Sequence, residues 1–371
     1  MELGERIVVV GAGVAGTTAA WVAARDHAAT EVVLVDPAPG SGASWVAGGM
    51  LAPITEAWPG EREVLDLGAA SLARWPAFAA AVEEASGRRV GLRTEGTLGV
   101  VVDAADREDL DRVVEHLRAW GRDAERLTGR ETRRREPALG PAVRAGIAVP
   151  DDLAVDNRML LAALREAARQ AGVVERAEAV HAVVDEGVEL ASGVLPADRV
   201  VVAAGAWSAA LHPALADLVR PVKGEILRLR ARSGSLPPPA HTVRAAVSGR
   251  SVYAVPRDDG RLVLGATQYE VGFDDDVTVA GVRDLLADAE RVLPGIGDYA
   301  LEETAASFRP GTADNLPVFG PVPGAPSSLV ACFGHGRNGI LLTALTADVM
   351  AGVLSGHPVP DDIRTLVEVA T

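Results

Sequence analysis

One stretch near the start of the chain decides its fold: Ile7-Val8-Val9-Val10, followed by Gly11-Ala12-Gly13-Val14-Ala15-Gly16. The four β-branched residues predict a short buried strand. Residues 17–28 are rich in alanine, contain no Pro or Gly, and predict a helix. A second apolar run at residues 31–35 predicts another buried strand. Strand, helix and strand make one βαβ unit, and parallel sheets are built from such crossovers.

Three glycines in this stretch have the spacing of a phosphate-binding turn. Gly11 permits the tight turn, Gly13 lets the backbone approach a pyrophosphate, and Gly16 lets the helix pack on the strand. Free N–H groups at the helix start then face the phosphates. Asp36 closes the second strand, where its carboxylate can accept ribose hydroxyls. This order predicts a dinucleotide site and disfavours NADP, but it does not separate NAD from FAD.

Further elements alternate along the rest of the chain. The pattern predicts helices over residues 64–85, 106–120, 156–171, 277–293 and 338–354, and strands over 97–102, 198–203, 226–230, 251–255, 262–265 and 329–333. Residues 37–49 are predicted to be a loop. Apolar and charged residues alternate in 226–230, which is typical of a half-exposed strand.

The distribution of these elements predicts an α/β protein. We expect a Rossmann-type dinucleotide-binding domain made of separate segments, with an interleaved α+β antiparallel-sheet substrate domain. The predicted limits are 1–86, 151–221 and 308–371 for the first domain and 87–150 and 222–307 for the second.

Composition excludes several classes of protein. The chain has 371 residues, with 36 Lys+Arg against 51 Asp+Glu and a formal net charge of −15, so we expect no nucleic-acid partner. Lys223 is the single lysine, and Cys332 is the single cysteine. No intramolecular disulfide and no cysteine-rich metal site can form, and no metal-ligand cluster stands out.

We expect the protein to be cytoplasmic. Glu2 and Glu5 stand where a signal peptide has basic residues, and the apolar run that follows ends at Gly11. No segment reaches the roughly 20 apolar residues that a membrane span requires. The sequence leaves the oligomeric state open, including a homo-oligomer.

Four segments downstream carry a resemblance to a known family. They are GASWVAGGMLAP at 42–53, YAVPRDDGRL at 253–262, FRPGTADNLP at 308–317 and GHGRNGILL at 334–342. Together with the N-terminal glycine turn, they resemble the D-amino-acid-oxidase-type FAD-dependent oxidoreductases. Within that family the chain is most similar to the glycine oxidases of thiamine biosynthesis. The resemblance spans essentially the whole chain, with the motifs in the same order.

The resemblance implies FAD as the cofactor. The residues it assigns to FAD are Gly11, Gly13, Val14, Ala15, Gly16, Asp36, Ala43, Ser44, Gly48, Gly49, Met50, Val180, Ala204, Gly205, Gly336, Arg337, Asn338, Gly339 and Ile340. A helix start after Gly336 would face the flavin pyrimidine and stabilise its negative charge. Some relatives hold flavin through a cysteine. Because Cys332 lies inside an apolar strand, we expect it to be a small buried residue and FAD to be non-covalent.

The resemblance also assigns three residues to the substrate. Arg309 would bind the carboxylate of an amino acid, for which the planar guanidinium is the natural partner. Tyr253 would add a hydroxyl to the same carboxylate, although it also suits a plain strand position. Arg337 would lie at the mouth, with its carbonyl accepting from the amine, or have a purely structural role. His335 is expected to have a packing or hydrogen-bonding role.

The implied activity is oxidative deamination of glycine and other small amines. Hydride would pass from Cα to flavin N5, the imine would hydrolyse to glyoxylate and ammonia, and O2 would be reduced to H2O2. The absence of an obvious catalytic base in the sequence fits this chemistry, since a neutral amine needs none. Two alternatives stay open: a D-amino acid dehydrogenase or sarcosine-type amine oxidase, and a flavin-binding module without this activity.

Overall fold

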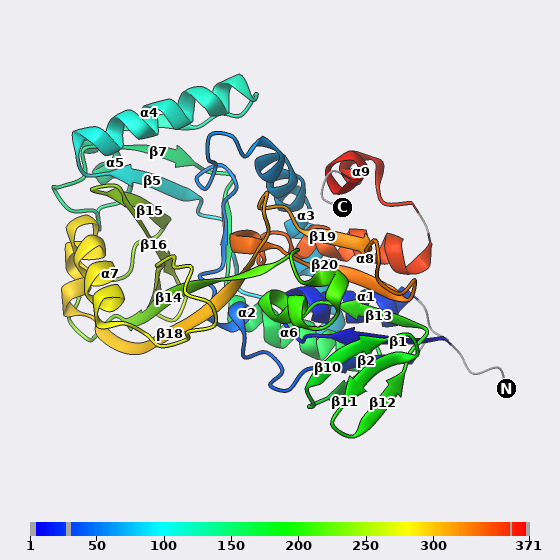
Figure 1. Ribbon diagram of the computed structural model, residues 1–371. Coiled ribbons are helices and arrows are strands. Elements are labelled where there is room, and N and C mark those ends of the chain that lie inside the picture. Colours follow the sequence, from blue (N-terminus) through cyan, green and yellow to red (C-terminus); the bar gives the residue numbers. More distant parts are fainter. Residues whose placement is uncertain (1–4, 27–30, 357, 369–371) are drawn as a thin grey trace.

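The computed structural model describes residues 5–26, 31–356 and 358–368. Its first sheet grows from the opening stretch (Figure 1): β1 (Arg6–Val10) and β2 (Glu31–Val35) pair in parallel, and α1 (Val14–Asp26) lies between them in the chain. Alternate residues of both strands enter hydrophobic clusters on opposite faces of the sheet. These strands are therefore buried on both sides, as their continuous β-branched pattern predicts.

Six strands form this sheet in the order β19-β20-β13-β1-β2-β9. The added strands are β9 (Val174–Arg176), β13 (Arg199–Val202), β19 (Val318–Pro321) and β20 (Leu329–Phe333). All neighbours are parallel except β19 and β20. Antiparallel strands β10 (Val180–Val184), β11 (Gly187–Leu190) and β12 (Gly193–Pro196) cover one face.

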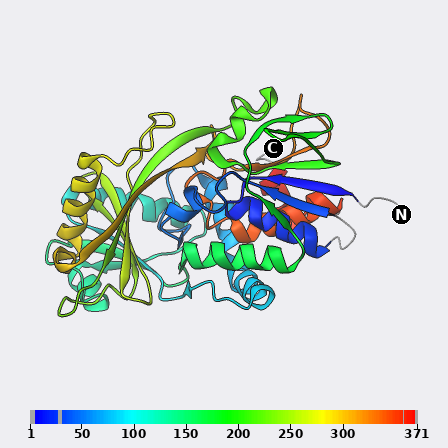
Figure 2. The same cartoon turned by 90° about the horizontal axis from the view of Figure 1, so that it is seen from below.

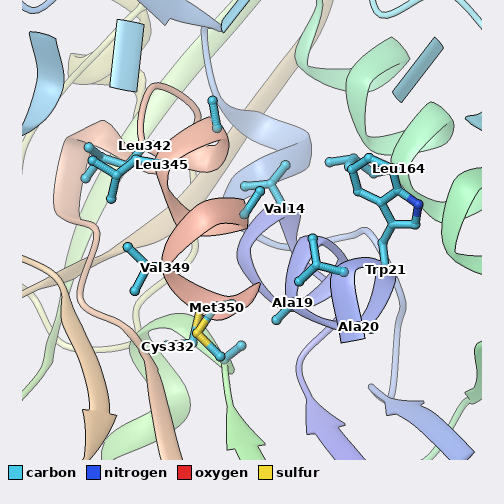
Figure 3. Close-up of a cluster of buried hydrophobic side chains, with 14 of the residues drawn as sticks. Val14, Ala19, Ala20, Trp21, Leu164, Cys332, Leu342, Leu345, Val349 and Met350 are labelled. Carbon is cyan, nitrogen blue, oxygen red and sulfur yellow. The ribbon is translucent and has the colours of Figure 1, made fainter. Parts of the chain in front are cut away.

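Helices cover the other face. α1 packs against α6 (Asn157–Gln170) and α8 (Thr343–Ser355), and α3 (Arg62–Ser86) packs outside them against both and against α9 (Asp361–Glu368). Figure 3 shows side chains of this cluster, including Trp21, Cys332 and Met350. Within the described residues, no helix is long and apolar enough to cross a lipid bilayer.

The second sheet has eight strands in the order β18-β14-β17-β16-β15-β5-β7-β6. They are β5 (Thr97–Val101), β6 (Glu125–Thr128), β7 (Ala145–Val149), β14 (Arg220–Arg230), β15 (Thr242–Val247), β16 (Arg250–Pro256), β17 (Arg261–Gly265) and β18 (Ala300–Gly311). All pairs are antiparallel except β5 with β15. α7 (Val279–Val292) packs on one face. The α/β class predicted from the sequence is confirmed, with a second sheet that is antiparallel except at this one pair.

The remaining helices, strands and turns lie outside these two sheets. They are α2 (Ala43–Val46), β3 (Met50–Leu51), β4 (Leu92–Arg93), β8 (Leu153–Val155), α4 (Ala104–Ala119), α5 (Gly129–Arg135) and the 3₁₀ turns η1 (Gly205–Ala210), η2 (Pro213–Leu215), η3 (Pro294–Asp298) and η4 (Gly336–Asn338). The long, curved strands β14 and β18 run from the α7 end toward the middle of the molecule (Figures 1 and 2). β18 crosses the domain limit predicted between residues 307 and 308. The domain limits stay predictions.

Three local predictions need correction. Residues 37–49 contain the one-turn helix α2 rather than loop alone. The helix predicted over residues 338–354 corresponds to α8, which begins at Thr343, because η4 and a further turn occupy residues 336–342. The strand at 226–230 is predicted to be half-exposed, but residues 226–229 are buried and Arg230 at its end is exposed. Its second face packs against the first domain, where Arg228 donates to the Trp45 carbonyl.

A buried carboxyl joins the second sheet to the loop after β3. Asp152 is fully buried; its Oδ2 accepts from Thr55 Oγ1 at 2.9 Å, and its Oδ1 has no hydrogen-bond partner within the described residues. Burial raises the pKa of Asp152 to about 7, and the negative charge of Glu56 adds to the rise. The folded state therefore binds a proton more tightly than the unfolded chain does.

We predict that Asp152 makes folding stability fall as the pH rises. Its contribution is fully present below the ordinary aspartate pKa and is lost as the pH rises through about 7. Asp152→Asn removes the ionisation. The unfolding free energy of the variant minus that of wild type should therefore be a few kcal/mol larger at about pH 8 than at about pH 4. Urea unfolding at both pH values measures this, with exposed Asp151→Asn as the control. A pH-independent difference between wild type and Asp152→Asn would contradict it.

Candidate functional site

A cavity of about 500 Å³ lies between the two sheets. On one side it is lined by the carboxyl ends of the parallel strands, represented by Val10, Val35, Ala203 and Phe333. Ligands of parallel α/β sheets bind outside these strand ends. On the other side it is lined by residues of β14, β16 and β18. The topology thus places a Rossmann-type crevice directly against the second sheet.

The glycine turn forms one end of the cavity. Gly11 has φ +105°, and a Cβ on Gly16 would lie 1.9 Å from the Gly11 carbonyl oxygen, so the helix start can pack this closely only with glycine. The N–H groups of Gly13 and Ala15 line this end and make no hydrogen bond to any described residue. Unpaired N–H groups at a helix start favour an anion. This cradle fits a pyrophosphate.

Asp36 is held at the cavity edge by two backbone groups. Its Oδ2 accepts from the Ala12 N–H at 2.7 Å, and its Oδ1 accepts from the Ala38 N–H at 2.8 Å. Each carboxylate oxygen retains a further acceptor site. The carboxylate is therefore fixed at the cavity edge with acceptor capacity left, and its predicted contact with ribose hydroxyls stays a prediction.

Segment 40–48 forms a long wall of the cavity. Ser44 Oγ accepts from the Val14 N–H at 3.0 Å, which ties this segment to the start of α1. Gly48 lies against Tyr253: a Cβ there would be 2.6 Å from the tyrosine ring. The cavity therefore runs from the glycine turn, along segment 40–48, to the β16 side chains.

Tyr253 and Arg309 stand at this second end. Both are half-buried and line the cavity. Tyr253 comes from β16, and burial raises the pKa of its hydroxyl to about 12, so it is a neutral donor at physiological pH. The ring fits against Gly265, where a Cβ would be 2.3 Å from the hydroxyl oxygen.

Arg309 is a cation without an anionic partner. Its Nη1 donates to the carbonyls of Thr267 (3.1 Å) and Lys223 (3.4 Å), and it makes no ion pair with any Asp or Glu of the described residues. Burial lowers its pKa, but arginine keeps its charge. Gly224 makes room for it, because a Cβ there would lie 2.5 Å from Nη1. This arrangement favours binding of a ligand carboxylate.

Arg337 and His335 serve different contacts. The Arg337 guanidinium donates to Glu61 Oε2, and Asn315 Nδ2 donates to Glu61 Oε1 at 2.8 Å. His335 is buried, with Nε2 3.0 Å from Thr346 Oγ1, and burial lowers its pKa to about 4. His335 also lines the cavity, and its packing or hydrogen-bonding role stays a prediction.

Most of the residues assigned to the cofactor line this cavity. They are Gly11, Gly13, Val14, Ala15, Asp36, Ala43, Ser44, Gly48, Val180, Ala204, Gly205, Gly336, Arg337, Gly339 and Ile340. Gly16, Gly49, Met50 and Asn338 are not among the lining residues: Gly16 packs against Gly11, Gly49 lies behind Gly48, Met50 belongs to a small hydrophobic cluster, and Asn338 is buried beside a separate, much smaller pocket. The cofactor roles of both groups of residues stay predictions.

Sequence reasoning did not find several lining residues. Among them are Trp207, Gly224, Ile226 and Ser307. A glycine inside a strand often marks a close approach by another group, so Gly224 carried a usable signal. Trp207 packs with two other aromatic rings at the rim, centred 5.4 Å from Phe273 and 5.7 Å from Phe308. Phe308 opens one of the recognised motifs, but Trp207 and Phe273 lie outside all of them, so no pattern revealed that the three rings meet.

Comparisons with known proteins agree with this geometry. A family model described as FAD dependent oxidoreductase matches residues 6–353. The bifunctional protein ThiO/ThiG of Synechocystis sp. is 33% identical over 361 residues, covering 95% of this chain and 52% of the relative. The glycine oxidase of Geobacillus kaustophilus is 32% identical, covering 94% of this chain and 92% of the relative.

Solved structures show the same fold. The crystal structure of glycine oxidase from Geobacillus kaustophilus superposes with a TM-score of 0.88 at 31% identity and covers 98% of both chains. Iminodiacetate oxidase from Chelativorans sp. BNC1 gives a TM-score of 0.85 at 27% identity, over 97% of this chain and 98% of the other. This chain spans about half the length of the ThiO/ThiG relatives. The resemblance drawn from the sequence motifs is confirmed.

Proposed function

Because the chain belongs to the family of FAD dependent oxidoreductases, we propose that it uses FAD to oxidise small amino acids, with glycine as the principal substrate. The overall reaction converts glycine, water and O2 into glyoxylate, ammonia and H2O2. Relatives named glycine oxidase that match most of the chain support this choice. The ThiO/ThiG relatives support a further role in supplying thiazole synthesis for thiamine.

The observation that carries the proposal is the free cationic end of Arg309. Two carbonyls hold one side of its guanidinium, and no described acidic residue pairs with it. A substrate carboxylate is the partner that would compensate this half-buried charge. Tyr253, also lining the cavity, would add a neutral hydroxyl donor. These two side chains would fix the carboxylate and thereby orient Cα.

The remaining residues shape the site around that anchor. Arg337 has its guanidinium engaged by Glu61, which leaves its backbone carbonyl as the group proposed to accept from the amine. Trp207, Phe273 and Phe308 form an apolar rim that would restrict water at the reacting carbon. No described histidine or carboxylate is needed as a base if the amine enters neutral.

The cavity residues fit FAD. The glycine turn would hold the pyrophosphate, Asp36 the ribose, and segment 40–48 the path toward Tyr253. FAD, when bound, supplies the acceptor for hydride from Cα. We propose that it is held non-covalently, because Cys332 is fully buried among apolar side chains (Figure 3), and burial raises the pKa of its thiol to about 12. Cys332 does line the cavity, but a protonated thiol is a poor nucleophile.

A substrate panel tests this function. Glycine, sarcosine, D-alanine and D-proline are each mixed anaerobically with the FAD-loaded protein. The loss of the oxidised flavin band at about 450 nm is then followed. We expect glycine to give the highest kcat/KM and aerated samples to form glyoxylate and H2O2. If none of the four substrates bleaches the flavin, the proposed amino acid oxidation is refuted. Preference for sarcosine or a D-amino acid would shift the assignment to those oxidases.

We predict that Arg309→Ala weakens substrate binding while FAD stays bound. A hydrogen bond to a charged group contributes about 1.5–3 kcal/mol, so KM should rise at least about tenfold. Steady-state kinetics and the flavin spectrum measure both effects. Arg230→Ala serves as the control, since it removes an exposed arginine from the far end of β14. An unchanged KM in Arg309→Ala would remove this residue from the site.

A further inference from the structure

A buried polar cluster behind the cavity wall has no part in the function proposed above. We call it the Asn157 cluster; it consists of Asn157, Arg228 and Arg257, all buried. Asn157 is the first residue of α6, Arg228 lies in β14, and Arg257 directly follows β16. The cluster therefore joins the first domain to two strands of the second sheet.

Asn157 binds two carbonyls within the short helix α2. Its Nδ2 donates to Ser44 O at 2.8 Å and to Trp45 O at 2.9 Å. Its Oδ1 accepts from Nη2 of Arg257 at 3.1 Å and from Nη2 of Arg228 at 3.4 Å. One amide thus couples segment 44–48 to both guanidinium groups.

Arg257 also contacts the cavity wall directly. Its Nη2 donates to Gly48 O at 2.8 Å, and a Cβ on Gly49 would lie 3.3 Å from this nitrogen and 2.1 Å from Val155 O. In a trans peptide the N–H points opposite to the carbonyl, so the Gly49 N–H points away from Arg257. That N–H makes no hydrogen bond to any described residue. Arg257 therefore fixes the orientation of the Gly48–Gly49 peptide.

The cluster also carries a net positive charge. Arg257 Nε lies 3.3 Å from Asp156 Oδ2, and Arg158, which borders the cluster, makes two hydrogen bonds to Glu303. Arg228 makes no ion pair within the described residues, and its pKa, lowered to about 10 by burial and by the two neighbouring arginines, leaves it charged. About one uncompensated charge thus lies behind segment 44–49.

The reacting end of FAD would lie beside this segment. The glycine turn lies at the end of the cavity proposed for the pyrophosphate. Gly48 contacts Tyr253 at the other end, where Arg309 is proposed to bind the substrate. The flavin ring must meet the substrate, so it must lie at this second end. A fixed positive charge there favours a cofactor that gains negative charge on reduction.

We propose that Arg257 is a positioning residue which, with Asn157 and Arg228, fixes segment 44–49 and raises the reduction potential of the bound FAD. The proposal rests on FAD binding and on the proposed position of the substrate end, but not on the identity of the amine. It goes beyond the substrate contacts, because none of the three side chains lines the cavity.

The test is the midpoint potential of the FAD-loaded protein, measured anaerobically against a reference dye without any amine. Arg257→Gln should decrease the equilibrium constant for two-electron reduction at least about tenfold, which corresponds to about 30 mV. Arg257→Lys keeps the charge and should retain most of the potential, but it should bind FAD more weakly, because one ammonium replaces the planar fork. FAD affinity is measured by titration of the apoprotein.

Two further variants keep the test decisive. Arg250→Gln removes an exposed cation from β16, paired with Asp288, and should leave the potential unchanged. Arg228→Gln should lower the potential in the same direction as Arg257→Gln and decides the matter if the latter fails to fold. A wild-type potential in the folded neutral variants, or an equal fall in Arg250→Gln, would overturn the proposal. These potentials are measured without an amine, so they do not depend on amine oxidation. A wild-type protein that binds no FAD would instead refute the proposal that FAD is the cofactor.

Discussion

The structure depends on one electrostatic constraint: a half-buried guanidinium, Arg309, which carbonyl oxygens hold and with which no carboxylate in the described part of the chain pairs. Such a charge is costly to desolvate, so the surrounding fold must compensate it until a ligand does. The pairing of β14 with β18 sets its position, since Val222 faces Arg309 across the ladder and Gly224 provides the space for the guanidinium. The long strands of the second sheet thus bring a specific cation to the Rossmann crevice.

The opposite end of the cavity uses backbone rather than side-chain charge. The glycine turn presents free N–H groups, and Asp36 is oriented by two N–H donors. Segment 40–48 connects the two ends; the Ser44 hydroxyl ties it to α1, and the Asn157 cluster binds its carbonyls. Cofactor and substrate would therefore share one wall, whose conformation is set by both domains. A substitution in the Asn157 cluster, which lies behind this wall, would therefore alter the reaction without contacting the ligand.

Sequence patterns revealed the parts whose chemistry is local. The βαβ unit, its glycines and Asp36 follow from strand and helix periodicity with fixed spacing. The positions of Arg309 and Tyr253 came from motif resemblance, and both do line the cavity. Patterns failed where partners are distant in sequence. Alternation predicted a half-exposed strand at 226–230, but Arg228 is buried because Trp45, 183 residues away, accepts its hydrogen bond. Separation along the chain likewise hid the contact of Trp207 with Phe273 and the pairing of Arg337 with Glu61.

The most direct test of the account is a crystal structure of the FAD-loaded protein with acetate, a carboxylate that has no amine to oxidise. The account predicts that acetate lies between the Arg309 guanidinium and the Tyr253 hydroxyl, at the end of the cavity remote from the glycine turn. Acetate bound elsewhere in the cavity, with Arg309 still turned to the Thr267 and Lys223 carbonyls alone, would contradict it.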